Sequence, residues 1–305
     1  MKRIILSRKG FDAKAGGGAS PIFSDGRFFS IPIPQDHPSP KKYEDLDFYG
    51  TSGTELLKEA SAKVKLTDYC HNDPLLNEDI GIFGQASSSQ TELKNNNVGP
   101  GDLFLFFGWF KNFSIKGRDL HHLFGWLQIK EIIEGSEAIT TYLKENNIAH
   151  PHGYGDTSKF SNNTIYVGKK NLEINGKKVF KRGHGLFKKT HNDLILTEAN
   201  KTRSRWKLPL EYFLNTEGLF LNRMKWENEK ECTIFYKGFG QEFILDIEKN
   251  PNVMKWAIKL IKKHGHSIAW IKKWTKNHTL WQPDIDIVET IFRYKGQSNS
   301  KSRNK

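Results

Sequence analysis

A cluster of charged residues close to the start of the chain precedes three consecutive glycines. The charged residues are Arg8, Lys9, Asp12 and Lys14, and the glycines are Gly16, Gly17 and Gly18. Basic side chains bind phosphates, a carboxylate can support bond cleavage at a sugar, and glycine lets the backbone approach a ligand closely. The pattern predicts a binding or catalytic loop, and the alternative is a surface hairpin with ordinary loop charges.

The apolar run from Ile4 to Leu6 is typical of a short buried strand that ends just before these residues. A rigid strand would therefore carry the polar loop, which is how many sites are built. The glycine run lacks the spacing of a phosphate-binding loop, and Ser20-Pro21 follows where a helix should begin.

A second polar group is formed by His71, Asn72 and Asp73, which precede Pro74. It is either a further set of site residues or an Asx-type turn in which Asn and Asp bond their own backbone. Residues 83–90 read as a small polar loop, and Gln85 within it is a candidate for hydrogen bonding to a base edge.

Two aromatic-rich strands are expected at residues 103–110, which include Trp109, and 121–129. The pair resembles the small barrels of the PUA-like superfamily, which contains readers and processors of modified bases. We therefore expect an α+β fold (α/β in the broad sense) with a mixed sheet or PUA-like barrel and flanking helices. Helices are expected at 54–63, 139–146 and 252–263, the last with one apolar face.

His150-Pro151-His152 offers two metal ligands, but no further ligands are evident in the sequence, so no metal site and no cofactor are predicted. The neighbouring pair His121 and His122 begins a strand, where alternation turns one ring inward. An inward histidine is usually a hydrogen-bonded core residue.

The chain has 305 residues and a net charge of +13, with the basic excess concentrated in its last third. Basic residues interleaved with aromatics favour a polyanion, most simply nucleic acid, although lysine-rich solvated faces give the same composition. The candidate DNA contacts are Arg203, Arg205, Lys207, Lys272 and Lys273.

Two cysteines are too few for a disulfide framework, and neither a signal peptide nor a membrane-spanning run is visible. A cytoplasmic location is expected, and no protein partner is evident. The expected organisation is one domain at residues 1–263, a basic tryptophan-rich helical extension at 264–294 and a disordered tail at 295–305.

Several motifs in the same order resemble the nucleotide-modification-associated domain family of the third type. They include Ser7-Arg8-Lys9-Gly10-Phe11-Asp12, His71-Asn72-Asp73-Pro74, Phe83-Gly84-Gln85, Gly101-Asp102-Leu103-Phe104, His150-Pro151-His152 and Gly240-Gln241-Glu242-Phe243. The resemblance covers residues 3 to about 262, and the chain also looks like the Brig-type antiphage DNA glycosylases. The acid expected after the family's His-x-Asp-Pro is replaced by Leu75.

The resemblance implies excision of bulky modified cytosines, such as glucosylated hydroxymethylcytosine, from phage DNA. Asp12 and then Asp73 are the candidate catalytic carboxylates, with substrate contacts expected from Arg8, Lys9, Phe11, Gly17, His71, Asn72, Gln85 and Trp109. The alternatives are a non-catalytic reader of modified bases and an enzyme that installs a base modification.

Overall fold

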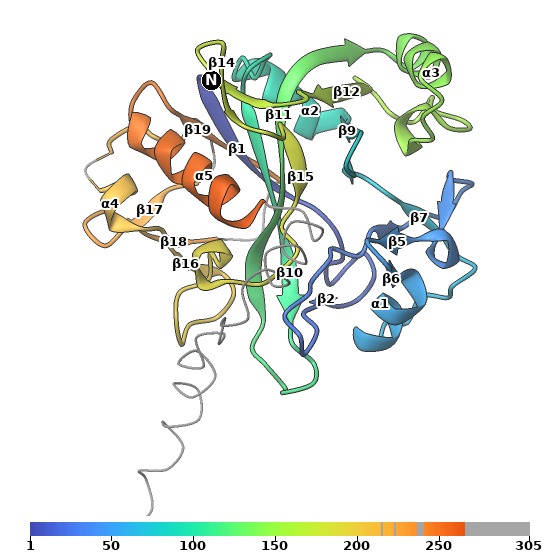
Figure 1. Ribbon diagram of the computed structural model, residues 1–305, viewed down its shortest axis with the longest axis horizontal. Coiled ribbons are helices and arrows are strands. Elements are labelled where there is room, and N and C mark those ends of the chain that lie inside the picture. Colours follow the sequence, from blue (N-terminus) through green and yellow to red (C-terminus); the bar gives the residue numbers. More distant parts are fainter. Residues whose placement is uncertain (215, 223, 237–240, 266–305) are drawn as a thin grey trace, which may run out of the picture. The chain divides into compact units, whose positions relative to one another are not determined.

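The computed structural model describes residues 1–214, 216–222, 224–236 and 241–265. They contain a large mixed sheet, four small sheets and five α-helices (Figure 1). The mixed α+β class expected from the sequence is confirmed.

The large sheet forms the centre of the fold. Its path runs β19 (Glu242–Asp246), β1 (Arg3–Arg8), β10 (Leu103–Lys111), β11 (Leu120–Glu134), β12 (Thr164–Gly168), β9 (Gly81–Gln85) and β8 (Leu75–Leu76). Two short strands pair outside this path, β15 (His184–Leu186) with β11 and β2 (Ser20–Pro21) with β10.

Strands β1 and β10 are apolar on both faces because both are buried in one large hydrophobic core. Ile4 to Leu6 and Leu103 to Phe107 have essentially no solvent exposure. The two strands run parallel, with Arg8 opposite Phe107, so the chain leaves both strands at the same edge of the sheet. That edge carries Arg8 at the end of β1 and Trp109 near the end of β10.

The small sheets and the helices surround this centre (Figure 1). The sheets are β3 (Ile33–Pro34), β7 (Tyr69–His71) and β4 (Lys41–Lys42); β16 (Arg205–Lys207), β18 (Thr233–Phe235) and β17 (Trp226–Asn228); β13 (Leu172–Ile174) and β14 (Lys177–Phe180); and β5 (Asp47–Phe48) and β6 (Thr51–Ser52). The helices are α1 (Gly53–Glu59), α2 (Ser87–Asn95), α3 (Ser136–Glu145), α4 (Leu210–Phe213) and α5 (Pro251–His264). Short 3-10 turns lie at Tyr43–Asp45, Pro151–Gly153 and Asn192–Leu194.

Helix α5 joins the core through the apolar face that its sequence predicts. Val253, Trp256, Ala257 and Leu260 are buried in the same cluster as β1 and β10. Asn250 caps the helix by accepting a hydrogen bond from the backbone N–H of Asn252, which satisfies one of the donors left free at a helix start.

Two expectations need correction. In the described residues the large sheet has open ends at β19 and β8 and does not close into a PUA-like barrel. Residues 83–90 are not a polar loop, because β9 ends at Gln85 and α2 begins at Ser87. Burial of Gln90 and Leu93 explains the helix, since packing against the core outweighs the serine-rich composition.

The proposed basic extension at 264–294, the tail at 295–305, and with them Lys272 and Lys273, lie outside the described residues, apart from His264 and Gly265. Within the described part of the chain, none of the helices combines the length and apolarity needed to cross a bilayer.

His121 and His122 on β11 are both buried, and burial lowers the pKa of each to about 3. Each ring has a partner: His121 accepts from the Trp206 indole, and His122 donates to the Leu123 carbonyl. Both rings are therefore neutral in the folded protein at pH 7. In the unfolded chain a histidine has its ordinary pKa of about 6.5, so below this pH the unfolded chain binds protons that the folded protein does not, and unfolding becomes more favourable.

We therefore expect stability to be full above pH 6.5 and to fall as the pH drops below it. Each buried histidine contributes a slope approaching about 1.4 kcal/mol per pH unit. Urea unfolding of His122→Gln and of the wild type between pH 5 and 7.5 measures the free energy of unfolding. Its slope against pH should be smaller in the variant by the contribution of one histidine. Equal slopes in the two proteins would contradict the assignment.

Candidate functional site

The loop that follows β1 places Asp12 and Arg8 side by side. The Asp12 Oδ1 atom accepts hydrogen bonds from the backbone N–H groups of Lys14 and Ala15 at 2.8 and 2.7 Å. Its other oxygen, Oδ2, lies 3.7 Å from the Arg8 guanidinium. The carboxylate is thus held in one orientation, and its side chain remains 32% exposed.

Asp12 and Arg8 line a cleft of about 630 Å³, a volume within the usual range of small-molecule and cofactor sites. Its walls come from the loop after β1, the end of β10, the start of β11, the loop before β16 and the end of β18. The lining residues are Arg8, Phe11, Asp12, Ala13, Lys14, Trp109, His121, Arg203, Ser204, Phe235 and Tyr236. Five residues predicted from the sequence, Arg8, Phe11, Asp12, Trp109 and Arg203, therefore meet in one cleft.

Trp109 and Arg203 form one wall of the cleft. The Arg203 guanidinium carbon lies 3.7 Å from the centroid of the Trp109 ring, a cation–π arrangement. The indole N–H of Trp109 donates to Asp119 Oδ1 at 2.8 Å, which fixes the ring. A flat, fixed ring beside a guanidinium suits both base stacking and phosphate contact.

The three glycines have different roles. A Cβ on Gly16 would lie 2.4 Å from the Phe11 ring, so that residue must be glycine for Phe11 to pack. No atom lies within 4 Å of the position that a Cβ would take at Gly17 or Gly18. Gly17 lines a second hollow of about 250 Å³ on which Phe11 and Trp109 also border.

Lys9 and Gln85 point to a buried carboxylate rather than into the cleft. Glu242 Oε1 accepts from Lys9 Nζ at 3.1 Å, from Gln85 Nε2 at 2.6 Å and from Ser7 Oγ at 3.1 Å. The Glu242 side chain is 1% exposed, and its Oε2 atom has no hydrogen-bond partner among the described residues. Glu242 borders a hollow of about 270 Å³ that shares Arg8 with the cleft.

Asp73 lies in a separate buried cluster with three histidines, one of them the predicted His71. Its Oδ1 atom accepts from the backbone N–H of Gly84 at 2.8 Å and contacts His150 Nε2 at 3.1 Å. Its Oδ2 atom lies 3.9 Å from His71 Nε2. His152 completes the cluster, with its ring 5.3 Å from that of His71. Asn72 is half-buried between His71 and Asp73.

Burial and the neighbouring charges set the protonation of this cluster. Burial lowers the pKa of His71 to about 3 and that of His152 to about 4. For Asp73, burial raises the pKa, but the hydrogen bond from His150 and the charges of the nearby histidines outweigh it and hold the pKa at about 2. At neutral pH the cluster therefore contains an ionised carboxylate beside two neutral imidazoles.

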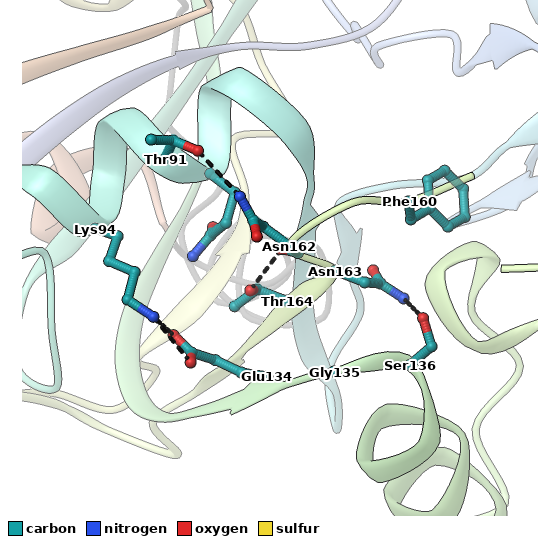
Figure 2. Close-up of a pocket in the computed structure, with 10 residues that line it drawn as sticks. Thr91, Lys94, Glu134, Gly135, Ser136, Phe160, Asn162, Asn163 and Thr164 are labelled. Carbon is teal, nitrogen blue, oxygen red and sulfur yellow. Dashed lines mark hydrogen bonds and ion pairs between the residues drawn. The ribbon is translucent and has the colours of Figure 1, made fainter. Parts of the chain in front are cut away.

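Figure 2 shows a fourth cavity, of about 410 Å³, between α2, the end of β11 and the start of α3. The Lys94–Glu134 ion pair lies on one side of it and the hydrogen bond from Asn163 to Ser136 on the other (Figure 2). Asn163 also binds His152, so this cavity reaches the outer side of the histidine cluster. None of the site residues predicted from the sequence lines it.

The remaining predicted DNA contacts are on β16. Arg205 pairs with Glu227 and lies over the Phe235 ring, 4.7 Å from its centroid, whereas Lys207 is exposed. Their role as DNA contacts stays a prediction.

Three groups at these sites are not among the site residues predicted from the sequence. Glu242 belongs to the Gly-Gln-Glu-Phe motif, but nothing in that motif indicates that its carboxylate accepts hydrogen bonds from three side chains. Tyr236 directly follows β18 and is part of none of the sequence motifs. His150 and His152 did carry a signal, the His-Pro-His motif, but their partner Asp73 lies 77 positions from His150 and only the fold reveals the pairing.

Fold and cleft together define a mixed α+β protein with cations and aromatic rings gathered around one carboxylate. Residues 3–246, most of the chain, match the family model for nucleotide modification associated domain 3, and the chain belongs to that family. Its role is therefore related to nucleotide modification, and the family predicted from the motifs is confirmed. No curated protein and no solved structure matches the chain.

Proposed function

We propose that this protein is a DNA glycosylase that removes a bulky modified base, of the glucosylated hydroxymethylcytosine kind, and leaves an abasic site. The observation that carries the proposal is the cleft that joins an oriented carboxylate, Asp12, to cations and aromatic rings. Family membership supports a modified nucleotide as the substrate. The sequence resemblance implies that such bases come from phage DNA.

The cleft suits a base that has left the double helix. A base must be extruded before an enzyme can reach its glycosidic bond, and pockets hold the extruded base by stacking and by hydrogen bonds. Trp109, Phe235 and Tyr236 offer ring faces or edges for stacking. Arg8, Lys14 and Arg203 offer cations for the flanking phosphates. The open space beside Gly17 would admit a sugar attached to the base.

In the proposed reaction the bond between C1′ of the deoxyribose and the ring nitrogen of the base breaks. Positive charge develops on the sugar, and the Asp12 carboxylate stabilises it or takes a proton from the attacking water. The water oxygen becomes the C1′ hydroxyl, and the base leaves with the bonding electron pair and a proton. No donor molecule is required.

The test is incubation of the purified chain with matched DNA duplexes that carry cytosine, hydroxymethylcytosine or glucosylated hydroxymethylcytosine. Alkaline cleavage at abasic sites reports excision. The proposal predicts cleavage of the glucosylated DNA alone, and the absence of cleavage in all three would overturn it.

A non-catalytic reader of modified bases is the second candidate, and one observation favours it. Both Asp12 oxygens already have partners, two backbone N–H groups and Arg8, as in a purely structural turn. A reader would retain the glucosylated DNA selectively without releasing a base.

The glycosylase and the reader would both use Arg203 as a phosphate contact, so both make the same prediction for its removal. Arg203→Ala should weaken DNA binding similarly for modified and unmodified DNA and reduce the slope of log K against log salt by about 1. Fluorescence anisotropy at several salt concentrations measures the slope. Lys144→Ala on α3 removes one exposed positive charge at a residue that does not line the cleft, so it serves as the surface control. An unchanged slope in Arg203→Ala would contradict the assignment.

A further inference from the structure

The cluster around Asp73 has the chemistry of a metal centre. His71, Asp73 and His152 each offer one ligand atom, and the three atoms lie within 4.8 Å of one another. Two imidazoles and one carboxylate form the ligand set of many catalytic zinc sites and of non-haem Fe(II) sites, which keep open positions for other ligands. Metal–ligand bonds of about 2.0–2.2 Å would need only a small inward movement of these side chains.

The hydrogen bonds of His152 fix which ring nitrogen is free. Asn163 donates through Nδ2 to the His152 carbonyl at 2.8 Å, so its Oδ1 atom must be the acceptor that faces the ring. His152 Nδ1 lies 2.7 Å from that oxygen and therefore carries the proton. Nε2 is therefore the ring nitrogen of His152 that is left to act as a ligand.

His71 is fixed in the same way. Gln35 Nε2 is directed at the Pro38 carbonyl, 3.5 Å away, which leaves Gln35 Oε1 as an acceptor. His71 Nδ1 donates to this oxygen at 2.9 Å, and the free Nε2 atom faces Asp73. Metal-binding histidines commonly donate their other ring nitrogen to an oxygen acceptor in this manner.

The carboxylate is oriented as well. His150 Nδ1 accepts from the backbone N–H of His152, so its Nε2 is the donor to Asp73 Oδ1. With Gly84 N–H on the same oxygen, Oδ2 is left directed toward His71. Gly84 is also required for space, since a Cβ there would lie 2.2 Å from the His152 ring.

We propose that His71, Asp73 and His152 bind one divalent first-row transition-metal ion through two Nε2 atoms and Oδ2, with open coordination positions. His150, Gln35 and Asn163 hold the three ligands in place without binding the ion. The charge of Lys9 acts on His71 and His152, but Lys9 is paired with Glu242 and so does not take the place of the ion. The inference does not depend on glycosylase activity.

A second group, His191, Asp193 and His264, also satisfies the distances for a metal site. Its carboxylate is already neutralised, because Lys263 Nζ lies 2.7 Å from Asp193 Oδ2 and His264 contacts the same oxygen. His191 Nδ1 is occupied in accepting from the Asp193 backbone. This group therefore serves as a matched control.

The test is metal analysis of the purified full-length chain by mass spectrometry, followed by titration of the chelator-treated protein. Separate arms use Co(II), Zn(II) and, without oxygen, Fe(II). The proposal predicts about one bound ion per chain and visible Co(II) absorption bands. Asp73→Asn should weaken metal binding by at least about 10-fold, which is the usual effect of changing even a residue that only supports a metal ligand. Asp193→Asn should bind as the wild type does.

Asp73→Asn keeps an acceptor for Gly84 and His150, so it should fold, and circular dichroism checks this. His71→Gln is the second variant, because His71 is the ligand nearest the surface, with 19% of its side chain exposed. No binding in any arm, or equal binding by wild type and both ligand variants, would overturn the proposal. Because metal binding is measured without DNA, the result does not depend on whether the chain excises a base.

Discussion

Replacement of Asp12 with asparagine is expected to lower the rate of base release by about 10²–10⁴-fold, the usual contribution of a positioned acid–base group. Binding of the modified DNA should be nearly unchanged. The reason is that asparagine keeps an oxygen that can accept from Lys14 and Ala15, so the turn survives while the negative charge is lost. Single-turnover release and anisotropy binding on the same DNA measure the two effects.

Asp25→Asn is the matched control for this experiment. Asp25 also accepts a backbone hydrogen bond within a turn and pairs with an arginine, Arg27, but it does not line the cleft. Its substitution should leave release unchanged. Equal loss of binding and release in Asp12→Asn would remove Asp12 from the proposed catalytic role and make it a recognition residue.

The second large effect is expected at Asp73, in the stability of the metal-free protein. Asp73→Ala leaves the Gly84 N–H and the His150 Nε2–H buried without an acceptor, and each buried unpaired donor costs about 1–3 kcal/mol. We expect the free energy of unfolding to fall by about 2–5 kcal/mol. Urea unfolding in the presence of a chelator measures the change.

In the same measurement of the free energy of unfolding, Asp73→Asn removes the negative charge but keeps the size and the hydrogen-bond acceptor of the side chain. Its amide oxygen can still accept both hydrogen bonds, and its amide NH₂ faces the free Nε2 of His71. Its stability without metal should therefore lie within about 1 kcal/mol of the wild type. A loss as large as that of Asp73→Ala would show that the ionised carboxylate itself holds the cluster together.

Local patterns in the sequence were enough for the elements of the core. The runs at Ile4–Leu6 and Leu103–Phe107 are apolar on every position, and strands buried on both faces have that pattern. The spacing of Val253, Trp256 and Leu260 likewise predicted α5. Helix α2 was missed because its serine-rich start has no local helix signal, and its buried face became visible only against the sheet.

The part of the site that lies near the strand ends could be predicted from the sequence, whereas the pairs of residues far apart in the chain could not. Arg8 and Trp109 lie near the ends of two parallel strands, and Asp12 follows the first of them, so their closeness could be expected. Lys9 also follows β1 but turns the other way, onto Glu242, which comes from a strand more than 230 positions later. No local pattern encodes such a pairing, and the same holds for Asp73 with His150 and His152.

The glycosylase proposal is tested most directly by the recovery of a free base from modified DNA with no donor present. The purified chain is incubated with glucosylated hydroxymethylcytosine DNA, and mass spectrometry counts released bases while alkaline cleavage counts abasic sites. We expect one free glucosylated base for each abasic site, and none from DNA with plain cytosine. Selective binding of the glucosylated DNA with no free base would contradict the glycosylase and leave a reader of the modified base.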